Sequence, residues 1–333
     1  MSHRGRGPTR VSSVSPLRSS TPLLAALCAL LALACDGDRE ERALDRLERL
    51  VFVPVASPVI GAEIGAPVDC SNSAPFLVDS FEVTREEWSA WLESLPADDP
   101  ARQSPEFWLD GSPVCPATGM TLAEAEAFAA SRGMRLPSAT EWLRIAVGRL
   151  GRQPFPWKPV DHASVANTAE LGLGRLAPVG TFENGSTPSG VYDLHGNAAE
   201  WVASIDLAPF PGSGDQRTWA MGGSYRSHKR PTFSTDPRAD LDADGQVDSG
   251  LSFNAFLLDP GSRSSDVGLR LLVDAERWLR EQASELGADA ASLARLERIG
   301  AGWGRDAVPL LRRLEGEAGE APQLAALLRG AGG

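Results

Sequence analysis

The order of hydrophobic and polar positions divides the chain into four stretches. An apolar run follows a basic start, and a charge-dense stretch comes next, with leucines at helical spacing. Short strand-like runs then alternate with clusters of Gly, Pro, Asn and Ser, before a final part in which apolar positions repeat at helical spacing. We therefore expect a signal peptide at 1–34, a charged tether or short helix at 35–50, a mixed domain at 51–273 and a helical extension at 274–333.

Three helix starts in the central stretch share one sequence signature. Thr84 is followed three residues later by Glu87, Thr121 by Glu124, and Ser138 by Glu141. In such a capping box the hydroxyl accepts a hydrogen bond from the backbone one turn on, and the Glu accepts one from the cap residue. Each pair precedes an apolar run, so we predict three amphipathic helices that bury one face.

The helical extension carries apolar residues from Trp278 to Leu314, with glycines where helices would end. This pattern predicts three or four short helices. Packing against the domain is the simpler interpretation of their apolar faces. The alternative is that the extension docks to another component of the cell envelope.

The apolar run Pro22–Ala34 follows four arginines and no acid, which is typical of a signal peptide. It is too short for the roughly 20 residues that span a bilayer. It ends in Ala32-Leu-Ala-Cys35, which resembles a bacterial lipobox, so we expect cleavage before Cys35 and acylation of that residue. The alternative is an ordinary signal peptide cut after Ala34. The prediction is a cell-envelope lipoprotein on the periplasmic or surface side, with the choice of membrane left open.

Composition narrows the classes of partner and fold. The 333 residues carry a net charge of -12, which would repel a phosphate backbone, so nucleic acid is not an expected partner. Gly 33 and Pro 25 favour a loop-rich fold. Only four Cys are present, which is too few for a disulfide framework. Only four His are present as possible metal ligands.

A series of motifs in one order resembles the formylglycine-generating enzyme, or sulfatase-modifying factor, domain family. The motifs include Gly133-Met-Arg-Leu-Pro-Ser-Ala-Thr-Glu-Trp142, Pro154-Phe-Pro-Trp157, Ala166-Asn167, Pro178-Val-Gly180, Gly190-Val-Tyr-Asp-Leu-His-Gly-Asn-Ala-Ala-Glu-Trp201, Met221-Gly-Gly-Ser-Tyr225 and Gly268-Leu-Arg270. The resemblance runs from about Leu50 to Val273. It implies an α+β, C-type-lectin-like fold with many loops, which agrees with the glycine and proline content.

The catalytic positions of the family are altered in this chain. Members that oxidise a sulfatase cysteine use two cysteines that bind copper, and these fall on Ser227 and Thr232 here. A hydroxyl cannot replace a thiolate on Cu(I), so copper and formylglycine-generating activity are not expected. Ser224, polar in the family's active site, is retained, and His228 lies beside the altered position.

An iron-dependent branch of the family, active in thiol-histidine biosynthesis, would need a histidine-rich helix. His162, His195 and His228 are not at metal-ligand spacing, and His195 lies in a Leu-His-Gly-Asn turn. We therefore expect these histidines to be ordinary loop or surface residues.

Calcium is the metal that the resemblance favours. One family site carries over as the Asp193 side chain, the carbonyls of Gly196 and Ala198, and the Glu200 carboxylate. Oxygen ligands with two carboxylates suit Ca²⁺. The other family site begins at Asn167 and Thr168, but its downstream Asp falls on Leu171, so we expect it to be lost or weak.

A second calcium loop is suggested by residues outside the family pattern. Asp240, Asp242, Asp244 and Asp248 occupy the first, third, fifth and ninth places of an EF-hand-like loop, with Gly245 at the sixth. The twelfth place is Leu251 rather than a bidentate Glu, so a full EF-hand is not expected. The alternatives are a looser calcium loop and a solvated acidic turn.

Cys70 and Cys115 would meet an oxidising compartment after export. A bridge between them would close about 45 residues, worth about 4 kcal/mol in the chain-entropy model. Two separate buried thiols are the equally weighted alternative.

Two functions from different classes follow. The first is a non-catalytic, calcium-stabilised scaffold that binds an envelope protein, peptide or glycan. The alternative is a divergent oxidoreductase or protein-modifying enzyme that uses residues such as Ser224, Ser227 and His228. A Ser and a His in neighbouring positions do not make a catalytic triad without a carboxylate and the right geometry.

Overall fold

The computed structural model describes residues 41–55, 59–60, 68–69, 74–103, 112–148, 163–203, 218–228, 233–234 and 254–333. The predicted signal peptide, Cys35, Cys70, His162, Thr232 and the acidic loop from Asp240 to Asp248 lie outside these ranges. In the part of the chain that is described, no helix is long and apolar enough to cross a membrane.

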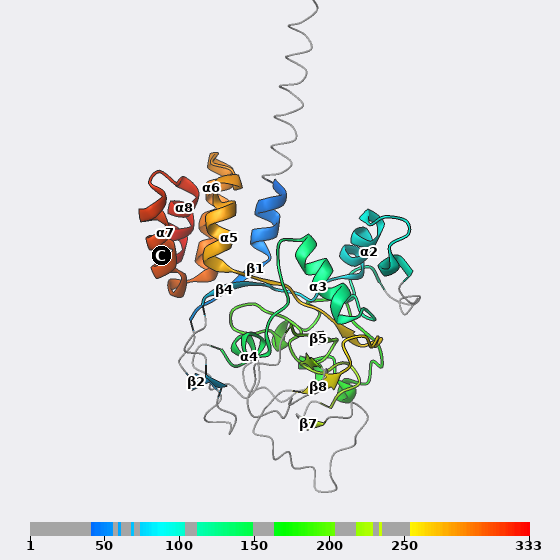
Figure 1. The fold of residues 1–333 in the computed structure, drawn as a ribbon. Helices are drawn as coiled ribbons and strands as arrows, with labels where there is room; N and C mark the ends of the chain where they lie inside the picture. Colours follow the sequence, from blue (N-terminus) through cyan, green and yellow to red (C-terminus); the bar gives the residue numbers. More distant parts are fainter. Residues whose placement is uncertain are drawn as a thin grey trace, which may run out of the picture.

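A three-stranded antiparallel sheet joins the two ends of the domain. Its order is β1-β4-β10, with β1 at Leu50–Val53, β4 at Phe76–Asp79 and β10 at Leu272–Asp274. All four residues of β4 are buried. The reason is visible in Figure 1, where helices lie on one side of this sheet and the loop-rich part of the domain on the other.

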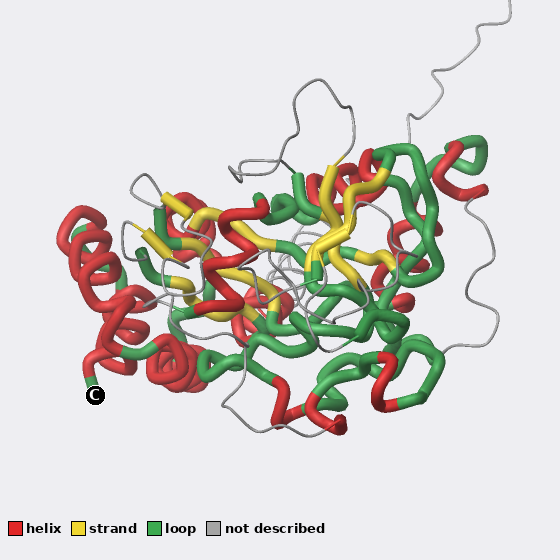
Figure 2. Tube along the Cα trace, turned by 90° about the horizontal axis from the view of Figure 1, so that it is seen from below, coloured by secondary structure: helices red, strands yellow, loops and turns green. Residues whose placement is uncertain are grey.

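A second sheet of five short strands lies in the loop-rich part (Figures 1 and 2). Its order is β7-β8-β6-β5-β9, and a separate pair is formed by β2 and β3. β5 pairs antiparallel with β6 and parallel with β9. The bounds are β2 Val59–Ile60, β3 Val68–Asp69, β5 Ala199–Trp201, β6 Thr218–Met221, β7 Phe233–Ser234, β8 Ala255–Leu258 and β9 Val267–Gly268. The domain is therefore α+β with little regular structure, as its motifs implied.

The three predicted capping boxes are confirmed. They start α2 (Arg85–Ser94), α3 (Leu122–Ser131) and α4 (Ala139–Val147), and each has both reciprocal hydrogen bonds. At α2 the Glu87 carboxylate accepts from the Thr84 N–H at 2.9 Å, while Thr84 Oγ1 accepts from the Glu87 N–H at 3.3 Å. These bonds are local, so three residues of sequence suffice to specify each helix start.

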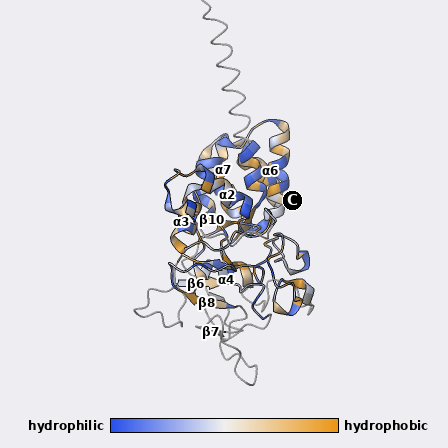
Figure 3. Cartoon of the chain, turned by 90° about the vertical axis from the view of Figure 1, so that its right-hand side faces the viewer, coloured by the Kyte–Doolittle hydropathy of each residue, from blue (hydrophilic) through white to orange (hydrophobic). Residues whose placement is uncertain are grey.

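The C-terminal extension forms four α-helices that share a core with the domain. They are α5 (Ala275–Gln282), α6 (Ala290–Trp303), α7 (Val308–Ala318) and α8 (Pro322–Gly332), and Figure 3 shows hydrophilic and hydrophobic residues on α6 and α7. One cluster of buried side chains includes Trp278 and Leu311 of the extension together with Leu77 of β4. The extension therefore packs on the domain.

A helix at residues 41–48 lies beside this bundle, at the position of the expected tether. Its Leu44 and Leu47 are buried in the same core. Arg295 of α6 donates to carboxylates of Glu41, Asp45 and Glu48 at 2.9, 2.6 and 2.8 Å. The start of the domain and its C-terminal extension are thereby held together.

Helices α6 and α8 cross at two glycines. A Cβ added to Gly300 would lie 2.1 Å from the Leu327 carbonyl oxygen, and one added to Gly330 would lie 1.9 Å from that of Glu297. Such distances are far inside van der Waals contact, so the crossing requires residues without a side chain.

We predict that Gly300→Ala or Gly330→Ala lowers the free energy of unfolding by about 1–3 kcal/mol, because the helices must separate. Thermal unfolding followed by circular dichroism measures this. The matched control is Gly316→Ala in α7, where an added Cβ meets nothing within 4 Å. It should be neutral or stabilising by up to about 1 kcal/mol. Equal effects at the crossing and at Gly316 would contradict this packing.

Candidate functional site

The turn between Tyr192 and Trp201 has an unusual backbone. Asp193 and Asn197 have φ of 58° and 57°, a conformation that non-glycine residues rarely adopt. Gly196, with φ 85°, packs so closely that an added Cβ would lie 2.4 Å from the Asn167 carbonyl oxygen. Backbone of this kind persists only where the surrounding structure fixes it.

Asn197 is the centre of the hydrogen bonds that fix the turn. Its Oδ1 accepts from the Ala177 N–H at 2.9 Å and from Asn167 Nδ2 at 3.0 Å. Its Nδ2 donates to Glu82 Oε2 at 2.7 Å, and the other oxygen of Glu82 accepts from the Ala198 N–H at 2.9 Å. The turn is thus tied to the segment after β4 and to the loop that begins at Asn167.

A buried ion pair lies beside the turn. Arg270 and Glu200 have side chains that are 0% and 1% exposed, and Arg270 donates through Nη2 and Nε to Glu200 Oε1 at 2.6 and 3.0 Å. Glu200 Oε2 accepts from Trp142 Nε1 at 2.7 Å, its one hydrogen bond with the described residues. Arg270 also donates to the carbonyls of Asp79 and Tyr192. Burial lowers the pKa of Arg270, but the carboxylates of Glu200, Glu82 and Asp193 together raise the pKa above its ordinary value.

Two more acids are buried within electrostatic reach of this pair. Burial raises the pKa of Asp193 from 3.8 to about 6, against the opposing effects of the Gly180 N–H and Arg270. Burial also raises the pKa of Glu82 well above its ordinary value, with further contributions from the Asp193 and Glu200 charges. Three carboxyl groups therefore share one guanidinium, and ionisation of all three leaves an excess of negative charge.

The donor atoms of the predicted calcium site are oxygens, the ligand type that Ca²⁺ prefers. Asp193 Oδ2 accepts from the Gly180 N–H at 2.8 Å, and Oδ1 has no partner among the described residues. Glu200 Oε2 accepts a single hydrogen bond and keeps a lone pair. The carbonyls of Gly196 and Ala198 belong to the same turn. No three His, Cys, Asp or Glu side chains within the described ranges form a metal-binding group.

The predicted catalytic region is a turn that uses its own hydroxyls. Ser227 Oγ accepts from the Ser224 N–H at 2.9 Å, and Ser224 Oγ donates to Asp266 Oδ2 at 2.7 Å. The Ser224 side chain is buried. Both hydroxyl oxygens are therefore part of the internal hydrogen bonding of this segment.

His228 is not positioned to activate a serine. Its side chain is 60% exposed, and its Nδ1 lies 3.3 Å from Glu170 Oε1. Its backbone carbonyl accepts from Asn254 Nδ2 at 2.8 Å. His195 is buried in the turn described above, as expected for a structural residue.

Cys115 is a buried free thiol. Burial raises the pKa of its Sγ, which disfavours the reactive thiolate. Its partner in the predicted bridge, Cys70, lies outside the described ranges. The bridge and the two separate thiols therefore both stay predictions.

Two residues of the site were not predicted as such. Glu82 is a single acid after a short strand, and Arg270 follows a Gly-Leu pair. Both positions lie in stretches that resemble the family, Glu82-Val-Thr84 and Gly268-Leu-Arg270. These stretches were the signal that could have suggested a structural role.

Comparison with known proteins agrees with this architecture. A hercynine oxygenase of Mycolicibacterium thermoresistibile is 31% identical over 251 residues, covering 64% of this chain and 54% of that protein. A formylglycine-generating enzyme of Bos taurus is 31% identical over 163 residues, 42% of each chain. An inactive C-alpha-formylglycine-generating enzyme 2 of Bos taurus is 28% identical over 195 residues, 43% of this chain and 64% of that protein.

The chain spans about half the length of the hercynine oxygenases that it matches. Residues 36–275 match the family described as the sulfatase-modifying factor enzyme 1-like domain. That range contains both sheets, the three capped helices and the turn with its buried ion pair. The chain belongs to the sulfatase-modifying factor enzyme 1-like, or FGE-sulfatase, family and has the α+β fold of that family.

Proposed function

We propose that this protein is a non-catalytic, lipid-anchored member of its family that binds an envelope protein, peptide or glycan. The observation that carries the proposal is the hydrogen bond from the Ser224 N–H to Ser227 Oγ. At the position where copper-dependent relatives carry a thiolate, this chain has a hydroxyl whose oxygen completes a turn. Cu(I) prefers soft sulfur ligands, so this side chain is a poor substitute.

The polar groups around Ser227 support the same conclusion. Asp266 Oδ2 accepts from Ser224, and Asp266 Oδ1 accepts from Ser264. Arg226 Nη1 lies 3.8 Å from Asp266 Oδ1. No histidine is hydrogen-bonded to either hydroxyl among the residues described here. A nucleophilic serine needs such a base within hydrogen-bond reach. One relative carries the word inactive in its name, which shows that a non-catalytic member of this family has precedent.

Calcium would stabilise this scaffold at the turn from Asp193 to Glu200. The ion would be held by the two carboxylates of these residues and by the carbonyls of Gly196 and Ala198. Its charge would offset the charges of Glu82, Asp193 and Glu200; burial raises the pKa values of Glu82 and Asp193, and the neighbouring carboxylates add to that effect. The bound ion would hold the strained turn in place and take no part in chemistry.

The second candidate function is an enzyme of the family that works without the cysteine pair. The observation that favours it is the similarity to hercynine oxygenases. Ser224, Ser227 and His228 are then the polar groups of the altered site, and Thr232 is its fourth member. The exposed position of His228, directed at Glu170, counts against a Ser–His pair.

We predict that the protein lacking its leader consumes no oxygen with thiol substrates, with or without added copper. Ser227→Ala and His228→Ala should leave this unchanged, because neither side chain is placed to bind copper or a reacting atom. Oxygen-electrode assays measure oxygen consumption, and elemental analysis measures bound metal. Oxygen uptake, or a bound transition metal that either substitution removes, would support the enzyme instead.

Calcium should raise the melting temperature by about 5–10 °C when its free concentration is 100-fold above Kd. The shift should shrink below about pH 6, because protonated Asp193 cannot ligate and its pKa without the ion is about 6. Differential scanning fluorimetry with calcium or a chelator tests this. Asp193→Asn should abolish the shift, while Glu126→Gln, an exposed acid of α3, should retain it. An equal shift in both variants would place calcium elsewhere.

Replacing Cys35 by Ser should release the protein from the membrane fraction, because the predicted acylation needs that thiol. The measurement separates cell lysates into membrane and soluble fractions and detects the protein in each through a tag at its C-terminus. The Cys28→Ser variant, also in the leader, should remain membrane-bound. Membrane association that survives Cys35→Ser would indicate a different anchor.

A further inference from the structure

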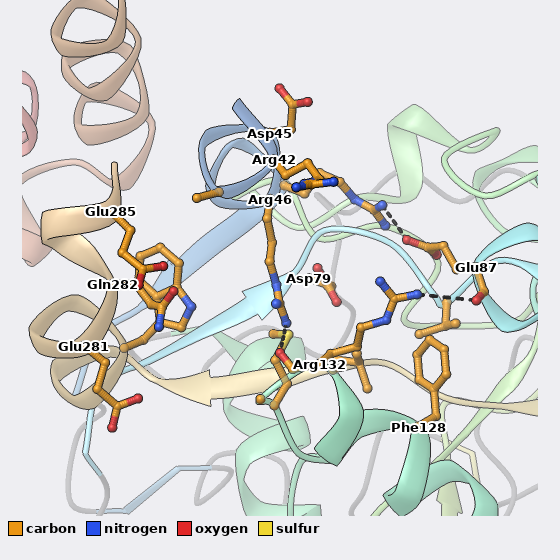
Figure 4. A pocket seen from close by; sticks show the side chains of 17 residues that line it. Arg42, Asp45, Arg46, Asp79, Glu87, Phe128, Arg132, Glu281, Gln282 and Glu285 are labelled. Atoms are coloured by element: carbon orange, nitrogen blue, oxygen red, sulfur yellow. Dashed lines mark hydrogen bonds and ion pairs between the residues drawn. The ribbon is translucent and has the colours of Figure 1, made fainter. Parts of the chain in front are cut away.

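A cavity of about 600 Å³ lies where the domain meets its two flanking helical parts. Its walls come from helix 41–48, the β1-β4-β10 sheet, the end of α3, and α5 (Figure 4). This volume is within the range of small-molecule sites. None of the residues of the turn or of the Ser227 region lines it. It is therefore a separate site, independent of the proposed function.

Asp79 forms the floor of this cavity. The residue is 8% exposed, and its backbone is fully bonded, since its N–H donates to the Leu271 carbonyl and its own carbonyl accepts from Arg270. Its carboxylate forms no hydrogen bond or ion pair with the described residues, and Figure 4 shows it beside the Arg46 side chain. A buried charge without a partner is costly. Arg49, Arg46 and Arg270 lie within electrostatic reach, but none of them donates a hydrogen bond to the carboxylate, so its oxygens are available to a donor on a ligand.

Arg49 lies next to Asp79 in the same cavity. It precedes Leu50, which pairs with Asp79 across β1 and β4, so the two side chains come from adjacent positions. Its Nη1 donates to Glu87 Oε1 at 2.6 Å, and its Nε is closed to solvent and has no acceptor among the described residues. The side chain is 40% exposed, so a ligand in the cavity would reach Arg49 through its terminal nitrogens.

The other walls add charges of both signs and apolar surface. Arg42, Arg46 and Arg132 line the cavity, and Arg46 donates to the Arg132 carbonyl at 2.5 Å. Phe128, Met134 and Trp278 supply the apolar part. The acids of the lining are Asp45, Asp79, Glu87, Glu281 and Glu285. Walls with both arginines and acids suit a ligand that carries an anionic group as well as a cationic one.

The pKa of Asp79 bears on whether its carboxylate can accept a hydrogen bond from a cationic group. Burial is the main cause that raises the pKa of Asp79 from 3.8 to about 6, and the Glu87 charge adds to it. The charges of Arg49, Arg46 and Arg270 lower the pKa, and the effect of Arg49 is the largest of the three. The carboxylate is therefore ionised near neutral pH and can accept from an ammonium group.

We propose that this cavity binds a small zwitterion whose ammonium group donates to Asp79 and whose carboxylate or phosphate accepts from Arg49. Free amino acids and a phosphoethanolamine headgroup share this chemistry. A ligand with a negative charge alone would leave the Asp79 carboxylate unsatisfied, and one with a positive charge alone would make no use of the Arg49 guanidinium.

Isothermal titration calorimetry on the protein lacking its leader tests the proposal. The probes are sn-glycero-3-phosphoethanolamine and the protein amino acids, with ethylammonium and inorganic phosphate as single-charge controls. At least one zwitterion should bind, and at least about tenfold more tightly than either control. Binding of the glycerophospho compound alone indicates a lipid headgroup, and binding of an amino acid alone indicates a free metabolite. No zwitterion binding up to about 10 mM would overturn the proposal.

Two variants separate recognition from folding. Asp79→Asn should weaken the zwitterion at least about tenfold while its melting temperature at about pH 7.5 stays level or rises, because an unpaired buried charge is removed. The matched control is Glu281→Gln, which removes an exposed acid from the wall of the same cavity and should change affinity less than about threefold. Retained binding in Asp79→Asn, or equal losses in both variants, would overturn the assignment.

Discussion

The buried ion pair between Arg270 and Glu200 is the interaction on which the domain depends. Arg270 bonds Glu200 of β5, the Asp79 carbonyl at the end of β4 and the Tyr192 carbonyl before the turn. Trp142 of α4 binds the second oxygen of Glu200. Both sheets, one helix and the strained turn thus meet at two fully buried side chains. Loss of one partner of such a pair typically costs about 3–5 kcal/mol, because the other charge is left uncompensated.

This pair also organises the two candidate binding sites. On one side it adds a single positive charge to Glu82, Asp193 and Glu200, which leaves the negative excess that suits a calcium ion. On the other side it takes the backbone carbonyl of Asp79, whose carboxylate then faces the cavity under helix 41–48. Both sites therefore share Arg270 as a common support, although they draw on different side chains for their ligands.

The region around Ser224 and Ser227 is held together by its own side chains. Ser224, Ser227 and Asp266 form a continuous set of hydrogen bonds within this turn. The hydroxyl groups therefore have a structural use in the turn. Meanwhile the flanking helices, which share one core with the domain, create the cavity at Asp79, a surface that the domain alone would leave open.

The sequence by itself determined the features whose partners are close along the chain. The capping boxes at Thr84, Thr121 and Ser138 act over three residues, and the ordered motifs identified the family. Only the tertiary structure decided which charges become buried together. Glu82 meets Asn197 across 115 positions and Arg270 meets Asp79 across 191, and no local pattern records such a contact. The cavity at Asp79 is also decided by the tertiary structure, because its walls come from both ends of the domain and form only when these two ends pack together.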